Sequence, residues 1–130
     1  MNSCHRLALT LVAGSALGAA AMFSVQAQGK PPVYAVIEID QISDADAFMK
    51  AVTATEPKAT QSVGGRFVIR TTKPVAIDGG TPPARFAVIA FDSEEKFKAW
   101  DSLPAIKELN AVRLKTTKSR AFMVEGLSNQ

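Results

Sequence analysis

The spacing of hydrophobic positions predicts short strands separated by helices. Strands are predicted over 33–39 (VYAVIEI) and 85–91 (RFAVIAF), which are dense in β-branched and aromatic side chains. Further strands are predicted over 66–70, after the turn Gly64-Gly65, and over 119–125. The near-continuous apolarity of 85–91 indicates burial on both faces.

The first helix is predicted to start at Ser43, whose spacing to Asp46 fits a capping box. Its apolar stripe consists of Phe48, Ala51, Val52 and Thr55. Pro57 is expected to end or bend this helix, because proline lacks an N–H and clashes with the preceding turn. A short helical piece over 58–62 would follow and end at the glycine pair.

A second helical region is predicted after the strand at 85–91. Asp92 is its expected cap, with Glu95 three residues on, and we assign Asp92 and Ser93 to capping alone. Phe97 and Trp100 share one face of this helix. Pro104 should interrupt it and begin a new helical segment. The inward stripe of that segment consists of Ile106, Leu109 and Val112.

The resulting order is β-α-β-β-α-β over roughly a hundred residues, the size of one domain. This order predicts the α+β class and a ferredoxin-like split βαβ fold, with the helices on one face of a four-stranded antiparallel sheet. We place the domain at 33–126, after a flexible leader at 28–32 and before a tail at 127–130.

Residues 1–27 have the pattern of a signal peptide. A basic start precedes an apolar run, and Val25-Gln26-Ala27 supplies a cleavage pattern, so we expect cleavage after Ala27. An uncleaved membrane anchor is the alternative, but the apolar run is short for a spanning helix. Cleavage predicts a periplasmic or secreted protein with no membrane association.

Removal of 1–27 removes Cys4 and His5, which are the single cysteine and the single histidine. The mature chain then excludes disulfides, Cys or His nucleophiles, and His-ligated zinc or haem. We therefore expect no metal and no cofactor. The remaining 14 basic and 12 acidic side chains give a net charge of +2, too mild and too scattered to indicate nucleic-acid binding.

Strand alternation sorts the side chains into two predicted sheet faces. The face expected to carry the helices consists of Val33, Ala35, Ile37, Ile39, Phe67, Ile69, Phe86, Val88, Ala90, Phe122 and Val124. The opposite face consists of Tyr34, Val36, Glu38, Arg66, Val68, Arg70, Arg85, Ala87, Ile89, Phe91, Ala121, Met123 and Glu125. Its apolar content exceeds what a monomer usually exposes, so we predict a homodimer that packs sheet against sheet. A bulge would shift this parity locally.

Several segments resemble the domain-of-unknown-function family 1330 (DUF1330). They are Gly64-Gly65-Arg66-Phe67-Val68-Ile69-Arg70, Arg85 to Ser93, Asp44 to Phe48, Trp100 with Ser102 and Arg113, and Val124-Glu125-Gly126. The resemblance spans about 33–126. It implies a dimeric α+β barrel, a superfamily that includes cofactor-free monooxygenases, isomerases and haem enzymes, whereas the family itself has no settled activity.

Arg66, Arg70 and Arg85 are the main candidate ligand residues, because guanidinium groups bind carboxylates and phosphates at two points. The alternative is that they form ion pairs with Glu38 and Glu125. Tyr34 is a candidate ligand or proton-donor residue, or else an interface aromatic. Glu38 is the candidate base, since burial would raise its pKa.

Trp100 and Arg113 complete the candidate ligand residues. Trp100 is interpreted first as core filling beside Phe97, and Arg113 first as positioning a helix end. We hypothesise an exported homodimer that binds a small anionic, partly apolar molecule in the cleft between sheet faces. The alternatives are a cofactor-independent oxygenase or isomerase in that cleft, and a purely structural or interaction module.

Overall fold

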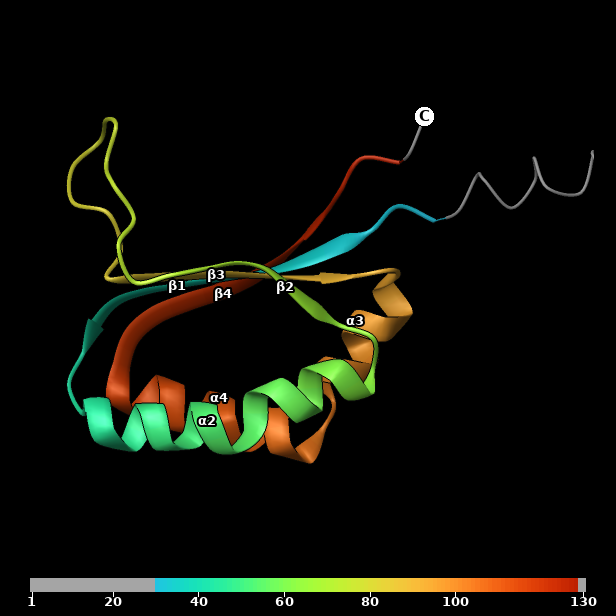
Figure 1. Ribbon diagram of the computed structural model, residues 1–130, viewed down its shortest axis with the longest axis horizontal. Helices are drawn as coiled ribbons and strands as arrows, with labels where there is room; N and C mark the ends of the chain where they lie inside the picture. The colour runs from blue at the N-terminus through green and yellow to red at the C-terminus, as the bar shows by residue number, and fades with distance from the viewer. Residues whose placement is uncertain (1–29, 129–130) are drawn as a thin grey trace, which may run out of the picture.

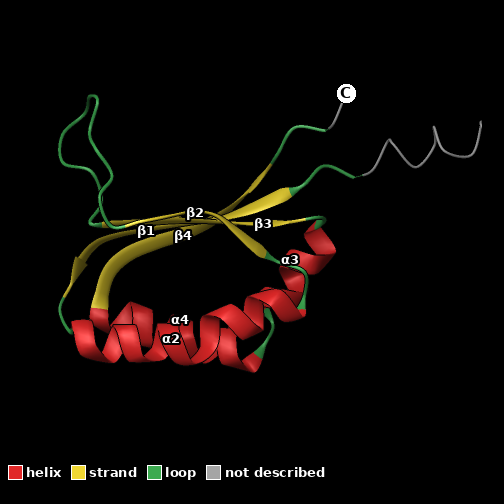
Figure 2. Ribbon diagram, in the orientation of Figure 1, coloured by secondary structure: helices red, strands yellow, loops and turns green. Residues whose placement is uncertain are grey.

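The structure, a computed structural model, describes residues 30–128, and the expected signal peptide lies outside them (Figure 1). Its elements are β1 (Val33–Ile42), α2 (Ala45–Ser62), β2 (Arg66–Thr71), β3 (Arg85–Phe91), α3 (Glu94–Asp101), α4 (Pro104–Thr116) and β4 (Thr117–Glu125). The strands form one antiparallel sheet in the order β2-β3-β1-β4. The helices all lie on one side of it (Figure 2), and the ferredoxin-like fold is confirmed. Within the described residues, no helix has the length and hydropathy needed to span a membrane.

Two of the predicted helix caps are wrong by one residue. The carboxylate of Asp44, not Ser43, caps α2 by accepting a hydrogen bond from the Ala47 N–H at 3.0 Å. The Ser93 hydroxyl, not Asp92, caps α3. Both turns contain two adjacent residues that can form an N-cap, Ser43-Asp44 and Asp92-Ser93, so the residue types alone do not identify which one is the cap. Pro104 does begin the separate helix α4, as predicted.

Helix α2 continues through Pro57 as one element, so Pro57 does not end it and no separate helix over 58–62 forms. Its buried residues recur every fourth position: Phe48, Val52, Glu56 and Thr60. Packing of this stripe against the core holds the helix together across a proline that costs about 3 kcal/mol in a helix interior.

The cross-strand register shows which side chains share a face, because directly opposed residues lie on the same side. Val33 opposes Phe91, Ala35 opposes Ile89 and Ile39 opposes Arg85. The helix-covered face of β3 therefore consists of Arg85, Ala87, Ile89 and Phe91, the reverse of the prediction. Both alternating sets of side chains in β3 are largely apolar, so alternation alone did not identify the set that faces the helices.

The same reversal occurs in β4. Met123 opposes Ala35 on the covered side, whereas Phe122 opposes Val36 on the face that no helix covers. We call that second face, with Tyr34, Val36, Glu38, Ile69, Phe86, Val88, Ala90, Phe122 and Val124, the open face.

A bulge in β2 separates two arginines that were predicted to point the same way. Arg66 opposes Ala90 on the open face, and Phe67 opposes Ile89 on the covered face. The register then shifts by one residue, so that Ile69 lies on the open face and Arg70, opposite Ala87, on the covered face. The predicted positions of Ile69 and Arg70 are therefore exchanged.

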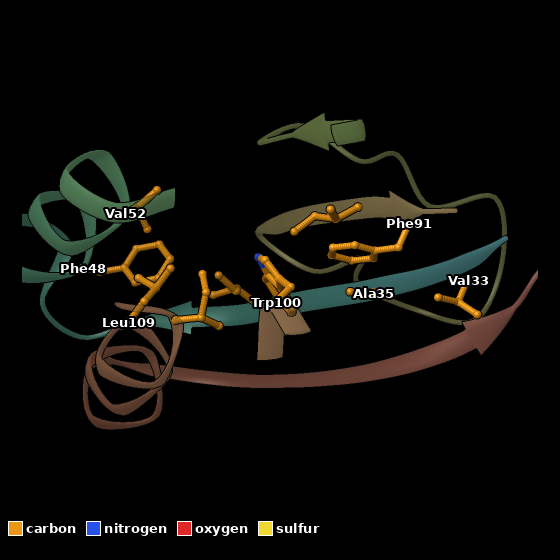
Figure 3. Close-up of a cluster of buried hydrophobic side chains, with 10 residues drawn as sticks. Val33, Ala35, Phe48, Val52, Phe91, Trp100 and Leu109 are labelled. Carbon is orange, nitrogen blue, oxygen red and sulfur yellow. The ribbon is translucent and has the colours of Figure 1, made fainter. Parts of the chain in front are cut away.

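An aromatic cluster fills the core near α3. The Phe91 ring lies 5.7 Å from Phe97, edge to face, and 5.4 Å from Trp100. The Trp100 Nε1–H donates to the buried Thr60 Oγ1 at 3.1 Å. Figure 3 shows Trp100 between Phe91 and the group of Phe48, Val52 and Leu109. The core-filling interpretation of Trp100 agrees with these contacts.

The predicted turn at Gly64-Gly65 ends α2 and begins β2. Gly64 has φ of 75°, and its N–H donates to the Gln61 carbonyl, as in a helix C-cap. A Cβ atom on Gly65 would lie 2.7 Å from the Phe91 ring and 2.8 Å from Thr60. Only glycine therefore allows β2 to approach the core this closely.

Candidate functional site

A cavity of about 220 Å³ lies between the covered face of the sheet and helices α2 and α4. Its volume equals that of roughly seven water molecules at about 30 Å³ each, which suits a small organic molecule. It lies inside the subunit, not in the sheet-to-sheet cleft that we predicted. The face reversal in β3 and the bulge in β2 are the causes, since they direct predicted cleft residues inward.

Most of the cavity wall is apolar. The apolar residues come from β1, α2, β3, α3 and α4: Ile37, Ile39, Phe48, Met49, Val52, Phe86, Ala87, Trp100, Ile106 and Leu109. Four of them are labelled in Figure 3. The stripes of α2 and α4 turn these side chains toward the sheet, so the wall follows from the same periodicity that builds the core.

The polar part of the wall carries a net positive charge. Its charged members are Arg70 from β2, Arg85 from β3, Arg113 from α4 and Glu56 from α2, a formal charge of +2. Asn110, Thr71 and Thr72 add neutral hydrogen-bonding groups. A partly enclosed site with this excess of cations favours an anion.

Glu56 is the buried carboxylate of the cavity, only 8% exposed. Arg70 Nη2 lies 3.4 Å from its Oε2 and also stacks over the Phe67 ring, 5.1 Å from the ring centre. Burial raises the pKa of Glu56, and the positive charge of Arg70 offsets only part of this increase. The carboxylate is thus a stronger base than an exposed glutamate.

Arg113 enters the cavity from α4. Its Nη1–H donates to Ser119 Oγ at 2.8 Å, and its Nε–H lies 3.5 Å from Asn110 Oδ1. Burial lowers the pKa of this guanidinium, and no described residue forms an ion pair with it. A half-buried cation held only by neutral partners would be stabilised by an anion.

Arg85 opposes Ile39 at the start of β3, and its side chain is half-buried. Among residues 30–128 it forms no ion pair. The cavity therefore contains two guanidinium groups, those of Arg85 and Arg113, without a protein carboxylate.

The structure brings together four of the predicted ligand residues, namely Arg70, Arg85, Trp100 and Arg113. Sequence reasoning missed Glu56 and Asn110. Glu56 lies four residues after Val52 and eight after Phe48, so a charge on the inward stripe of the helix was the available signal.

Three predicted site residues lie elsewhere. Arg66 forms an ion pair with Asp92 at 3.1 Å, and the bonds from Arg66 and Lys96 lower the pKa of that carboxylate. Glu38 forms an ion pair with Arg120 on the open face. Tyr34 is on the open face as well, with its ring against Gly126. The predicted ion-pair alternative holds for Arg66 and Arg70, but their partners are Asp92 and Glu56 rather than Glu38 and Glu125.

The described residues contain no cluster of three His, Cys, Asp or Glu side chains that could hold a metal ion.

The open face is largely apolar and carries no helix (Figure 1). Its side chains at Ile69, Phe122 and Val124 are 45%, 45% and 40% exposed. Val36, Val88 and Ala90 fill the space between them and are themselves buried. An apolar sheet surface of this kind marks an interaction site.

Solved structures with the same fold include two of a protein of unknown function from Rhodopseudomonas palustris. One matches at 13% identity with a TM-score of 0.59, and covers 89% of this chain and 97% of that one. A protein from Nitrosomonas europaea, provisionally named an antibiotic biosynthesis monooxygenase, matches at 16% identity with a TM-score of 0.55, covering 77% and 93%. A similarly named protein from Caulobacter crescentus matches at 11% identity with a TM-score of 0.55, covering 82% and 99%. These likenesses show the fold.

No curated protein gives a significant match to the chain. A family model described as "Domain of unknown function (DUF1330)" matches residues 32–127.

Proposed function

The chain belongs to the DUF1330 family, and we propose that it binds a small organic anion with an apolar body in the cavity between its helices and its sheet. One observation carries this proposal: three arginines and a single glutamate share a cavity whose wall is mostly apolar. Of these arginines, only Arg70 forms an ion pair within the described residues.

A carboxylate is the ligand group that best fits this arrangement. Arginine binds carboxylates through two parallel hydrogen bonds, and enclosure strengthens the attraction. The aliphatic and aromatic wall would contact the remainder of the ligand. A purely structural module needs no such cavity, so the cavity supports binding over that alternative.

Trp100 provides a direct binding assay, because it is the single tryptophan of the chain and lines the cavity. We expect 3-phenylpropanoate and hexanoate to change its fluorescence saturably. The neutral 3-phenylpropanamide should bind about tenfold more weakly, since it lacks the charge.

Arg85→Met should weaken 3-phenylpropanoate binding about tenfold or more. The matched control is Arg66→Met, which removes an arginine that pairs with Asp92 outside the cavity and should leave the affinity unchanged. No saturable signal with either acid, or equal affinity in wild type and Arg85→Met, would contradict the proposal.

We further propose that two copies pair through their open faces and that residues 1–27 direct export to the periplasm or the medium. The exposed apolar face supports the pairing. The apolar run and cleavage pattern support export. Intact-mass measurement of the protein recovered from its own host should give a mature chain that begins at Gln28. Recovery of the full 130-residue chain would exclude cleavage.

A second candidate is a cofactor-independent oxygenase or isomerase reaction in the same cavity. Glu56 is the observation that favours it, because it is a buried carboxylate among arginines. The fold likeness to the proteins from Nitrosomonas europaea and Caulobacter crescentus supports it by analogy alone.

A further inference from the structure

We propose that Glu56 accepts a proton from the ligand itself, and that the substrates are small carboxylic acids with an enolisable carbonyl group, such as 2-oxo acids. This inference rests on the proposed binding function. It assigns a reaction and a named base to the cavity.

The geometry leaves one oxygen of Glu56 available. Oε2 accepts from Arg70 at 3.4 Å, longer than the roughly 2.8 Å of a strong charge-assisted hydrogen bond. Oε1 has no hydrogen-bond donor among the described residues. Every fully buried side-chain oxygen of these residues has a hydrogen-bond partner. Oε1 has none, so it is not fully buried. Glu56 lines the cavity, so a ligand there can reach this oxygen.

The surroundings of Glu56 suit a general base. The other charged groups of the cavity are Arg70 from β2, Arg85 from β3 and Arg113 from α4, all cationic. Burial raises the pKa of Glu56, which increases its basicity. The guanidinium groups keep a carboxylate ionised and stabilise negative charge that develops on a bound substrate. Base and anion-stabilising groups thus come from four different elements around one space.

The proposed step needs no external reagent. The substrate carboxylate binds the guanidinium groups of Arg85 and Arg113. Glu56 takes a proton from the carbon beside the carbonyl, and the C–H electron pair becomes the new C=C bond. The carbonyl π electrons move to oxygen, where an enolate forms beside an arginine. Protonated Glu56 returns its proton to the same carbon, or to the enolate oxygen to give the enol. Nothing is oxidised or reduced.

Phenylpyruvate in D₂O tests this step, because a C3 hydrogen is replaced by deuterium whenever protonated Glu56 exchanges with solvent, or the enol is released, before C3 is reprotonated. The exchange is followed by proton NMR after subtraction of the buffer-catalysed rate, with the full chain as purified. We expect wild type to accelerate exchange, and Glu56→Gln to lose roughly a hundredfold of that acceleration. Glu56→Asp should retain part of it. Glu38→Gln, which changes the open-face carboxylate paired with Arg120, should keep the wild-type rate.

Trp100 fluorescence separates this inference from the binding proposal. If Glu56→Gln binds phenylpyruvate like wild type but loses exchange, the proton transfer is supported. If wild type binds phenylpyruvate without accelerating exchange, or if Glu56→Gln exchanges at the wild-type rate, the inference is overturned and binding stands. If neither phenylpyruvate nor 3-phenylpropanoate binds wild type, the binding function fails and this inference fails with it.

Discussion

The covered face of the sheet and the open face each carry groups that an isolated domain usually places on the other side. Beneath the helices, the sheet helps to enclose Arg70 and Arg85, with Glu56 and Arg113 opposite them. The open face presents Ile69, Phe122 and Val124 to solvent. Isolated domains normally keep charge outside and apolar groups inside.

These groups fit the two proposals that a ligand occupies the cavity and that a second copy covers the open face. Charged groups around a cavity gain stability when a ligand or water satisfies them. Apolar groups on an open sheet gain stability when another surface removes them from water. The two proposals, a bound anion inside and a second copy outside, follow from one comparison and are tested on opposite sides of the sheet.

The largest expected effect is on the open face. The double variant Ile69→Lys/Phe122→Lys places charge where two copies would meet, and should weaken dimerisation by about 3 kcal/mol or more, over a hundredfold in Kd. Sedimentation velocity at micromolar concentration measures it. Leu114→Lys, at an exposed leucine of α4, should leave the dimer intact. A wild-type monomer under these conditions would refute the pairing.

The next effect concerns the approach of β2 to the covered face. Gly65→Ala should lower the free energy of unfolding by about 2 kcal/mol, because the added methyl group meets Phe91 and Thr60. Urea denaturation gives the value. Gly65 does not have a positive φ, so backbone strain is not the expected cause of this loss. A loss below about 0.5 kcal/mol would mean that packing at Gly65 is not tight.

A smaller loss is expected for the buried hydrogen bond that holds Trp100. Thr60→Val keeps the shape of the side chain but leaves the indole N–H without an acceptor, and should cost about 1 to 2 kcal/mol. Thr53→Val, at an exposed position of α2, should change stability by less than about 0.5 kcal/mol. Thermal unfolding of both variants measures how much the hydrogen bond between Trp100 and Thr60 contributes to stability.

The smallest effect is a dependence on pH. Folding raises the pKa of Glu56 above its unfolded value of 4.5, so wild type loses stability as pH rises through the folded pKa. Glu56→Gln should therefore gain in Tm, relative to wild type, between about pH 4 and about pH 8.

Glu95→Gln should change the pH dependence of stability in the opposite direction. A hydrogen bond from Lys30 lowers the pKa of Glu95 to about 2, so its contribution is present above the unfolded pKa and is lost as pH falls. Relative to wild type, Glu95→Gln should be less stable at about pH 8 than at about pH 4. The same direction of change in both variants would contradict the assignment of Glu56 as a destabilised carboxylate.

The element order was predictable because periodicity and turn residues are local properties. The strand Arg85–Phe91 and the start of α4 at Pro104 were predicted at their observed positions. The inner phase of β3 was not predictable from alternation, because Phe86 and Val88 are as hydrophobic as Ile89 and Phe91. The choice depends on cross-strand register, which is a long-range property.

The candidate site was partly predictable for a related reason. Arg70, Arg85 and Arg113 were recognised as anion-binding groups, but their meeting point depends on the bulge and on the packing of α4. Glu56 was not predicted because the inward stripe was expected to stop at Thr55, ahead of Pro57, whereas the buried stripe continues to Thr60.

The extra residue in β2 makes the number of residues in this strand decide which surface carries Arg70. Val68 is the residue without a cross-strand partner, so deletion of its codon would restore regular alternation and leave Ile69 opposite Val88 and Arg70 opposite Ala87. Insertion of a codon between Ile69 and Arg70 would instead turn Arg70 to the open face, because one added residue reverses the side to which later side chains point. That change would remove a charge from the cavity and place it on the dimerisation surface, so natural selection should tolerate the loss of a codon at Val68 and exclude the gain of one after it.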